Sequence, residues 1–194
     1  RAVLPAKRWA ELVAPFPDGS FLVGLSSVHW REAWKYGERA FRYCQHDVGH
    51  ALACLSIAAA ALGWKLVLLD GVSNSTLASL LGLDRDADFA AAEREEAELL
   101  VLITPDVSTP LATDSKPLTA HGGDVHWQGL ANTLSPEHSA EWPVIDEVAR
   151  ATRHCESAPI QEDFSGFPSE DALFRTPVRR SEEHTSELQS PVLS

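Results

Sequence analysis

The sequence predicts an α+β domain in which one long helix packs against a small sheet. A single long helical pattern covers residues 30–62, and its second half is apolar on nearly every side, as expected of a helix buried at the centre of a domain. Two short apolar runs of strand length, residues 65–69 and 99–103, follow that pattern. A short helix is predicted between them, and the order strand, helix, strand favours an α/β or α+β sandwich.

The remaining elements are predicted from local signals. Residues 1–30 contain several prolines and predict a loop with one short helix near residues 7–13. A second short helix is expected at residues 75–81. The helix ends are expected at residues that suit them: Gly63 after the long helix, Ser73 or Asn74 before the short helix, and Gly82 after it. Beyond residue 105, the sequence is rich in Pro, Thr, Ser, Gly and Asp, which predicts an extended linker with one short helix near residues 143–153.

Composition and charge exclude some classes of function. The net charge of −12 argues against a surface for nucleic acid or anionic membranes. The longest apolar stretch, residues 51–62, is shorter than the roughly 18 residues of a membrane span. Three cysteines at irregular spacing, Cys44, Cys54 and Cys155, are expected to be free thiols. We therefore expect a cytoplasmic protein.

The two ends of the sequence suggest a piece of a longer protein. It begins at Arg1 and contains no methionine. Near the other end, RSEEHTSELQS over residues 180–190 resembles the translation of a sequencing-library adapter. We expect residues 181–194 to be disordered and to contribute nothing to the fold.

The first half of the long helix carries a cationic face. At about 100° per residue, five basic side chains fall within one arc: Lys35, Arg39, Arg42, His46 and His50. The opposite side is apolar: Phe41, Cys44, Val48, Leu52, Leu55, Ala59 and Leu62. A charged face is commonly just solvated, but here the helix is predicted to continue into the core. That favours an anionic ligand, such as a phosphate held by arginine side chains.

A metal site is a less favoured interpretation of the same helix. His46 and His50, with Asp47 between them, resemble the H-E-x-x-H pattern of zinc hydrolases. Asp is one methylene shorter than the glutamate expected there, and no third ligand is evident. A zinc hydrolase is therefore retained only as a third alternative.

Three strings together resemble a known family. WREAWKYGERAFRY at residues 30–43, DVGH at 47–50 and AAAALG at 58–63 are similar to the core of the nitroreductase-like flavoproteins, in the branch of thiazole/oxazole-forming peptide dehydrogenases. The similarity covers roughly residues 20–105. It implies an α+β sandwich that dimerises and holds FMN at the subunit interface. It also implies that Lys35 and Tyr36 are catalytic, while Arg39 and Arg42 are our candidates for binding the cofactor.

The implied chemistry is the oxidation of an azoline ring, in which carbon loses a proton and the flavin accepts a hydride. Lys35 would act as a base if burial and Arg39 lowered its pKa, and Tyr36 would do so as a phenolate. The arginine-rich phosphate motif of the family is absent, although VRRS at residues 178–181 resembles its start. Residues 1–105 are therefore expected to be the C-terminal half of one domain, and residues 106–180 a linker to a missing second one.

Two functions remain open at this point. One is an FMN-dependent oxidoreductase, inactive as this fragment and completed as a homodimer or a tandem-domain pair. The other is a degenerate domain of the same fold that serves as a scaffold or binds peptides without flavin.

Overall fold

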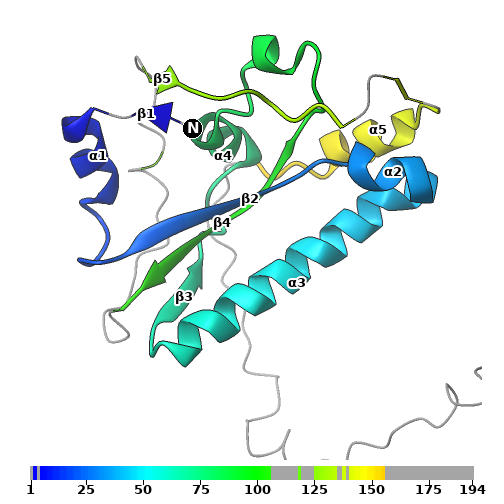
Figure 1. The fold of residues 1–194 in the computed structure, drawn as a ribbon. Helices are drawn as coiled ribbons and strands as arrows, with labels where there is room; N and C mark the ends of the chain where they lie inside the picture. The colour runs from blue at the N-terminus through cyan, green and yellow to red at the C-terminus, as the bar shows by residue number, and fades with distance from the viewer. Residues whose placement is uncertain are drawn as a thin grey trace, which may run out of the picture. The chain divides into compact units, whose positions relative to one another are not determined.

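The computed structural model describes residues 2–3, 5–105, 118, 125–134, 137–138 and 140–155. The elements, in chain order, are β1 (Ala2–Val3), α1 (Ala6–Val13), β2 (Phe21–Ser27), α2 (Trp30–Tyr36), η1 (Gly37–Arg39), α3 (Ala40–Ala61), β3 (Lys65–Leu68), α4 (Asn74–Leu81), η2 (Asp86–Phe89), β4 (Glu96–Thr104), β5 (His126–Trp127) and α5 (Pro143–Ala151) (Figure 1). The predicted adapter-derived tail and the VRRS string lie outside the described residues.

The main sheet has three antiparallel strands in the order β2-β4-β3, and a separate two-stranded sheet joins β1 to β5. β4 is the central strand, and residues 100–103 within it are at most 5% exposed. A continuous apolar run is what a strand covered on both faces requires. The antiparallel pairing gives a mixed α+β fold, as predicted.

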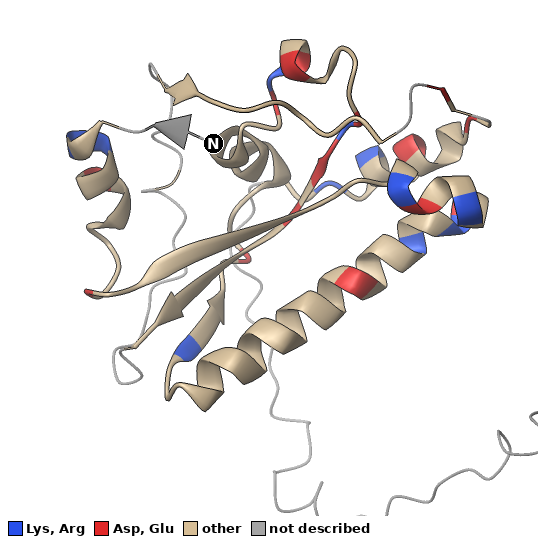
Figure 2. Ribbon diagram, in the orientation of Figure 1, with Lys and Arg blue, Asp and Glu red and all other residues tan. Residues whose placement is uncertain are grey.

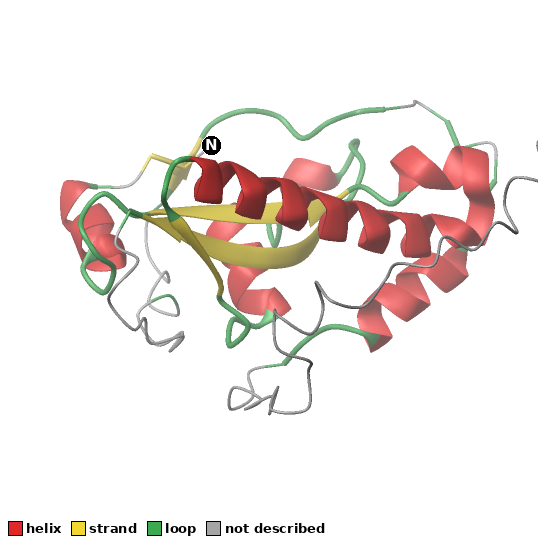
Figure 3. Ribbon diagram, turned by 90° about the horizontal axis from the view of Figure 1, so that it is seen from below, coloured by secondary structure: helices red, strands yellow, loops and turns green. Residues whose placement is uncertain are grey.

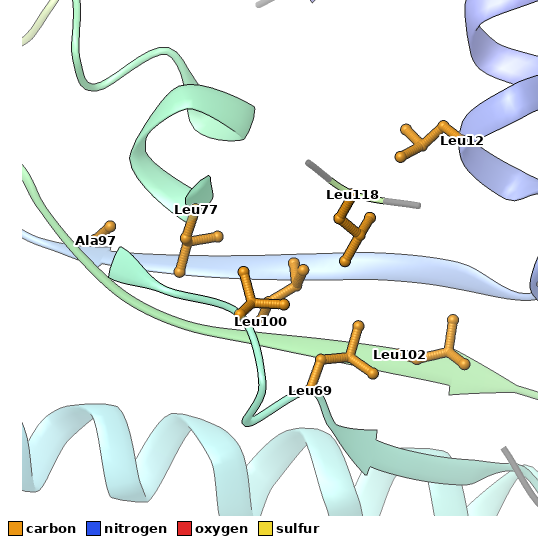
Figure 4. Close-up of a cluster of buried hydrophobic side chains, with 8 residues drawn as sticks. Leu12, Leu69, Leu77, Ala97, Leu100, Leu102 and Leu118 are labelled. Atoms are coloured by element: carbon orange, nitrogen blue, oxygen red, sulfur yellow. The ribbon is translucent and has the colours of Figure 1, made fainter. Parts of the chain in front are cut away.

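Helices pack against both faces of this sheet. α3 lies along one face (Figure 3), where Leu52, Leu55 and Ala59 pack against Val101 and Ile103 of β4. The other face carries a second cluster to which α1 and α4 contribute (Figure 4): Leu12, Leu69, Val72, Leu77, Ala97, Leu100, Leu102 and Leu118. The prediction of a long helix packed on a small sheet is confirmed.

The predicted helix ends are confirmed as well. The Ser73 hydroxyl accepts a hydrogen bond from the backbone N–H of Thr76 at 3.1 Å, which caps α4 at its start. Gly82 ends α4 in the left-handed conformation with φ of 75°, and Gly63 follows α3 with φ of 72°.

Strand β2 corrects the prediction for residues 1–30. The short helix expected there is present as α1, but residues 21–27 form a strand and not a loop. Gly24 interrupts the apolar run and hides its strand character. A Cβ at this position would lie 2.8 Å from Cδ2 of Leu81 on α4, so the end of the Leu81 side chain would have to shift to make room for a larger residue. β4 likewise begins earlier than predicted, at Glu96.

The predicted burial of α3 on all sides is wrong for this chain. Ala53, Ile57 and Ala60 are exposed, and Ile57 retains 71% of its accessible surface. In this second half, only the side of the helix that faces the sheet is covered, because no other element packs against its outer side within the described part of the chain. The second half of α3 therefore presents an uncovered apolar face.

Part of the predicted linker packs with the main body. β5 pairs with β1, and α5 matches the short helix predicted near residues 143–153. Ile145 of α5 is buried with Ala33 and Ala40, which ties α5 to α2 and to the start of α3. None of the helices in the described part of the chain combines the length and the apolar character that a bilayer span needs.

Candidate functional site

The predicted site residues lie around a corner between two helices. Sequence analysis predicts one continuous helix over residues 30–62, whereas the structure breaks it at Gly37 into α2, the short η1 and α3. Gly37 has φ of 58° and ψ of −137°, a conformation that glycine adopts far more readily than other residues. Lys35 and Tyr36 therefore lie at the end of α2, while Arg42 lies on the first turn of α3.

Lys35 and Tyr36 contact each other, and Tyr43 extends the pair. The Lys35 Nζ lies 4.9 Å from the centroid of the Tyr36 ring, and the rings of Tyr36 and Tyr43 are 4.6 Å apart between centroids. Tyr43 was not singled out from the sequence, although it stands seven residues after Tyr36 in the same string. The three side chains form a small cationic and aromatic cluster, which we call the Lys35 cluster.

The pKa of Lys35 is shifted in the direction opposite to the one expected from the sequence. Its hydrogen bond with Tyr36 is the largest cause and raises the pKa of Lys35; the charge interactions with Tyr36 and Glu32 act in the same sense. Desolvation opposes them only weakly because Lys35 is exposed. In this chain, Lys35 is therefore a cation at neutral pH, suited to donate a hydrogen bond and not to accept a proton.

The cationic face predicted for the first half of the helix is divided by the break at Gly37: Lys35 lies on α2 and Arg39 in η1, whereas Arg42, His46 and His50 lie on α3. All five of its side chains are exposed: Lys35, Arg39, Arg42, His46 and His50 (Figure 2 colours the lysines and arginines blue). Arg39 and Arg42 have no ion pair or hydrogen bond from their side chains within the described part of the chain. Their charges are therefore available to an anion.

The two histidines of the zinc-like pattern are also on the surface. The Nδ1 of His50 lies 3.4 Å from a carboxylate oxygen of Asp47, and both side chains are more than 70% exposed. Across the described residues, no three His, Cys, Asp or Glu side chains are grouped to hold a metal ion. This arrangement provides two imidazoles without a third protein ligand.

A small cavity of about 200 Å³ lies near this corner, between β2, α2 and α3. Its polar lining comes from Ser26, Ser27, Arg31, Glu32 and Asp47, and the thiol of Cys44 contributes to it. Burial is the main cause that raises the pKa of Cys44 to about 11, so the thiol stays protonated and weakly nucleophilic.

The cavity beside Cys44 is not formed by the predicted site residues, since Lys35, Tyr36, Arg39 and Arg42 are absent from its lining. Lys35 and Tyr36 are neighbours in the sequence and contact each other, whereas the two arginines are exposed. The three cysteines are free, as expected: Cys44, Cys54 and Cys155.

Comparison with known proteins adds no assignment. No family model, no curated protein and no solved structure matches this chain.

Proposed function

We propose that this chain contributes one side of an FMN site in a nitroreductase-like oxidoreductase that acts on azoline rings in peptides or on a related small substrate. One observation carries the proposal: basic side chains that are unpaired within the described residues and uncovered apolar side chains follow one another along the same side of α3. At about 100° per residue, Ile57 lies on the side that carries Arg42 and His46. A surface of this kind suits an anionic ligand beside a covering protein partner.

The exposed arginines fit the phosphate of FMN. A guanidinium presents several N–H donors in a plane and binds phosphate oxygens in pairs. Arg39 and Arg42 would hold this group because neither has a carboxylate partner within the described residues. Exposed charges alone are screened by salt, so the enclosure of the flavin ring would come from the covering partner.

The covering partner is a second domain of the same kind, either another copy of this chain in a homodimer or a tandem domain. Such a partner would bury the apolar side of α3, where Ala53 and Ile57 are exposed. It would also lower the pKa of Lys35, because removing water from an ammonium group disfavours its charged form. The raised pKa of Lys35 belongs to the uncovered chain.

Bound FMN would supply a hydride acceptor. The residues of this chain would manage the accompanying proton. Lys35, once desolvated, would take the proton from the substrate carbon at its Nζ atom, and the ring of Tyr36, whose centroid lies 4.9 Å from that atom, would orient it. Tyr43 packs on Tyr36 and would keep its ring in place.

A scaffold or peptide-binding domain without flavin is the second candidate. The observation in its favour is that Arg39 and Arg42 are solvent-exposed and outside the lining of the neighbouring cavity. The zinc hydrolase remains the third candidate and has the least support, because only His46 and His50 are placed together.

The test compares this chain with a longer protein that includes its upstream half. We expect FMN to bind weakly or not at all to the chain alone and to copurify with the longer protein. In the longer protein, Arg39→Ala with Arg42→Ala should release FMN. Lys35→Ala and Tyr36→Phe should retain FMN but slow flavin reduction by about a hundredfold or more.

The matched control is Lys65→Ala, since Lys65 is an exposed lysine on β3, away from the corner. It should change neither FMN content nor rate. Parental rates in the Lys35 and Tyr36 variants would remove the catalytic assignment. A longer protein that purifies without flavin absorbance would favour the scaffold.

A further inference from the structure

The exposed side of α3 carries a column of side chains of the kinds that bind transition metals. His46, His50 and Cys54 follow one another at intervals of four residues, and all three are exposed. At about 100° per residue, successive members of the column differ in direction by about 40°, so they lie on one side of the helix, one turn apart. The first and the last are about 12 Å apart along the axis, too far to share one ion. The column therefore offers pairs of ligands, in agreement with the absence of any group of three across the described residues.

The ring of His50 is oriented by a neighbouring carboxylate. Its Nδ1 lies within hydrogen-bond distance of Oδ1 of Asp47, at 3.4 Å. A carboxylate only accepts hydrogen bonds, so Nδ1 is the donor, and in the neutral imidazole Nε2 keeps the free lone pair. Metal-binding histidines commonly have such a carboxylate at the other ring nitrogen, where it fixes the tautomer and the orientation of the ring. This contact is the second observation, beside the spacing, that points to a metal ion.

The same contact selects one of the two pairs. Side chains on an α-helix lean toward the preceding turn, and the contact of His50 with Asp47, three residues earlier, shows that His50 does so. His46 is on that preceding turn, whereas Cys54 is on the following one. The side chain of His46 has no hydrogen bond or ion pair within the described part of the chain, so its ring nitrogens are available. The pair His46 and His50 is therefore favoured.

We propose that His46 and His50 chelate one divalent ion of the zinc class, with Asp47 as a positioning residue and water at the remaining coordination positions. Imidazole suits zinc, nickel and copper, whereas magnesium and calcium prefer oxygen ligands. No hydrolysis is assigned to the ion, because the Asp47 carboxylate contacts His50 and does not stand free as a general base. The proposal does not depend on the flavin proposal.

The first test is calorimetry of zinc chloride with the full chain, in a phosphate-free buffer with a reductant. We expect saturable binding, and His46→Ala or His50→Ala should each weaken it at least about tenfold, because each leaves a single ligand. His126→Ala is the matched control: His126 is exposed on β5, and no histidine or cysteine stands three or four residues from it. It should leave the affinity unchanged. The absence of saturable binding below about 1 mM zinc overturns the proposal. An equal loss in the control, or magnesium binding as tight as zinc binding, also overturns it.

The second test asks whether the spacing matters, and it begins by removing the thiol. Cys54→Ser alone should keep the affinity for zinc. If Cys54→Ser weakens binding as much as His50→Ala while His46→Ala has no effect, the ion belongs to the other pair and the proposal is overturned.

The imidazole is then moved along the helix in chains that lack both His46 and the thiol. His46→Ala with Cys54→His restores a spacing of four residues from His50 and should recover most of the affinity. His46→Ala with Cys54→Ser and Ser56→His has the same number of imidazoles at a spacing of six, and it should stay at least about tenfold weaker. Residues 54 and 56 are both exposed, so the fold should be kept. Equal affinities of these two chains would show general surface binding and refute the site.

The third test concerns Asp47. Asp47→Ala should weaken zinc binding about tenfold or less, because the contact is exposed, and Asp47→Glu should recover part of the loss. The nitrogen NMR shifts of the His50 ring, measured without metal at a pH where the ring is neutral, report which nitrogen carries the proton. They should indicate Nδ1 in the parent and move toward Nε2 in Asp47→Ala. Unchanged shifts together with an unchanged affinity would remove the positioning role.

Discussion

Gly37 lies against the indole ring of Trp142: a Cβ added at Gly37 would come within 3.1 Å of Cζ2 of that ring. This contact joins the corner between α2 and α3 to the segment that leads into α5. Gly37 is also the residue at which the helix predicted as continuous is broken, through its φ of 58° and ψ of −137°. Any larger residue would meet both the ring and an unfavourable backbone conformation.

The first prediction concerns this glycine. Gly37→Ala should destabilise the chain by about 1–3 kcal/mol, because alanine is strained at φ of 58° and its Cβ crowds Trp142. The free energy of unfolding in urea measures the effect. Gly49→Ala is the matched control: Gly49 is in the interior of α3 with nothing within 4 Å of an added Cβ. It should stabilise by about 0.5–1 kcal/mol, and equal losses in both variants would contradict the argument.

The second prediction concerns pH. Folding raises the pKa of Cys44 from 9.0 to about 11, so the folded state holds this proton more tightly than the unfolded state. The resulting stability is fully present below pH 9 and is lost as pH rises toward 11. The stability of Cys44→Ala should fall less steeply over that interval. The same slope in both proteins would show that another group is responsible.

The third prediction concerns reactivity. At pH 8, iodoacetamide should label Cys54 and Cys155, which are exposed, well before Cys44, which is buried and protonated. Peptide mass mapping distinguishes the three sites. In urea, Cys44 should react at a rate similar to the others. Fast labelling of Cys44 in the folded chain would contradict its placement.

The fourth prediction concerns the buried carboxylate of Glu93. His138→Ala should cost about 1–3 kcal/mol, because it leaves that carboxylate without its partner. Adding Glu93→Gln should restore part of the loss, since an amide is easier to bury than an unpaired charge. Urea unfolding of the two single variants and the double variant measures the coupling. Strictly additive losses would mean that the contact contributes nothing.

The fifth prediction concerns the uncovered side of α3. Ile57→Lys should leave the unfolding free energy of the isolated chain within about 0.5 kcal/mol, because Ile57 is 71% exposed. If a second copy covers α3 as proposed, the same change in the longer protein should dissociate that homodimer, as measured by light scattering. Leu52→Lys is the contrasting variant and should unfold the chain itself, since Leu52 packs against the sheet. A dimer that tolerates Ile57→Lys would place its interface elsewhere.

Local signals in the sequence were sufficient for much of the fold. The caps at Ser73 and Gly82 and the apolar run of β4 depend on neighbouring residues, so the sequence alone predicts them. The strand that contains Gly24 cannot be predicted from the neighbouring residues, because the space beside Gly24 is occupied by the side chain of Leu81 on another element, α4. Periodicity shows that a helix is apolar, but it cannot show whether another element or a partner covers it. The prediction that α3 is buried on all sides is wrong for that reason.

The candidate site also has a part that neighbouring residues predict and a part that depends on residues far apart in the sequence. Lys35 and Tyr36 are adjacent in the sequence, and their contact is present in the structure. The contact between His138 and Glu93 cannot be predicted from the sequence, since the two residues are 45 positions apart and neither belongs to a motif. Only the folded chain places them together.

The position of β4 in the sheet has a consequence for synthesis on the ribosome. β4 is the last of the three strands to be made, yet both of the others pair with it alone: Phe21 of β2 aligns with Ile103, and Lys65 of β3 aligns with Thr104. A nascent chain that ends before β4 has no strand onto which β2 or β3 can dock. The apolar side chains of α3 and α4 that pack on the sheet therefore stay exposed until residue 104 leaves the exit tunnel, and only then can the sheet assemble.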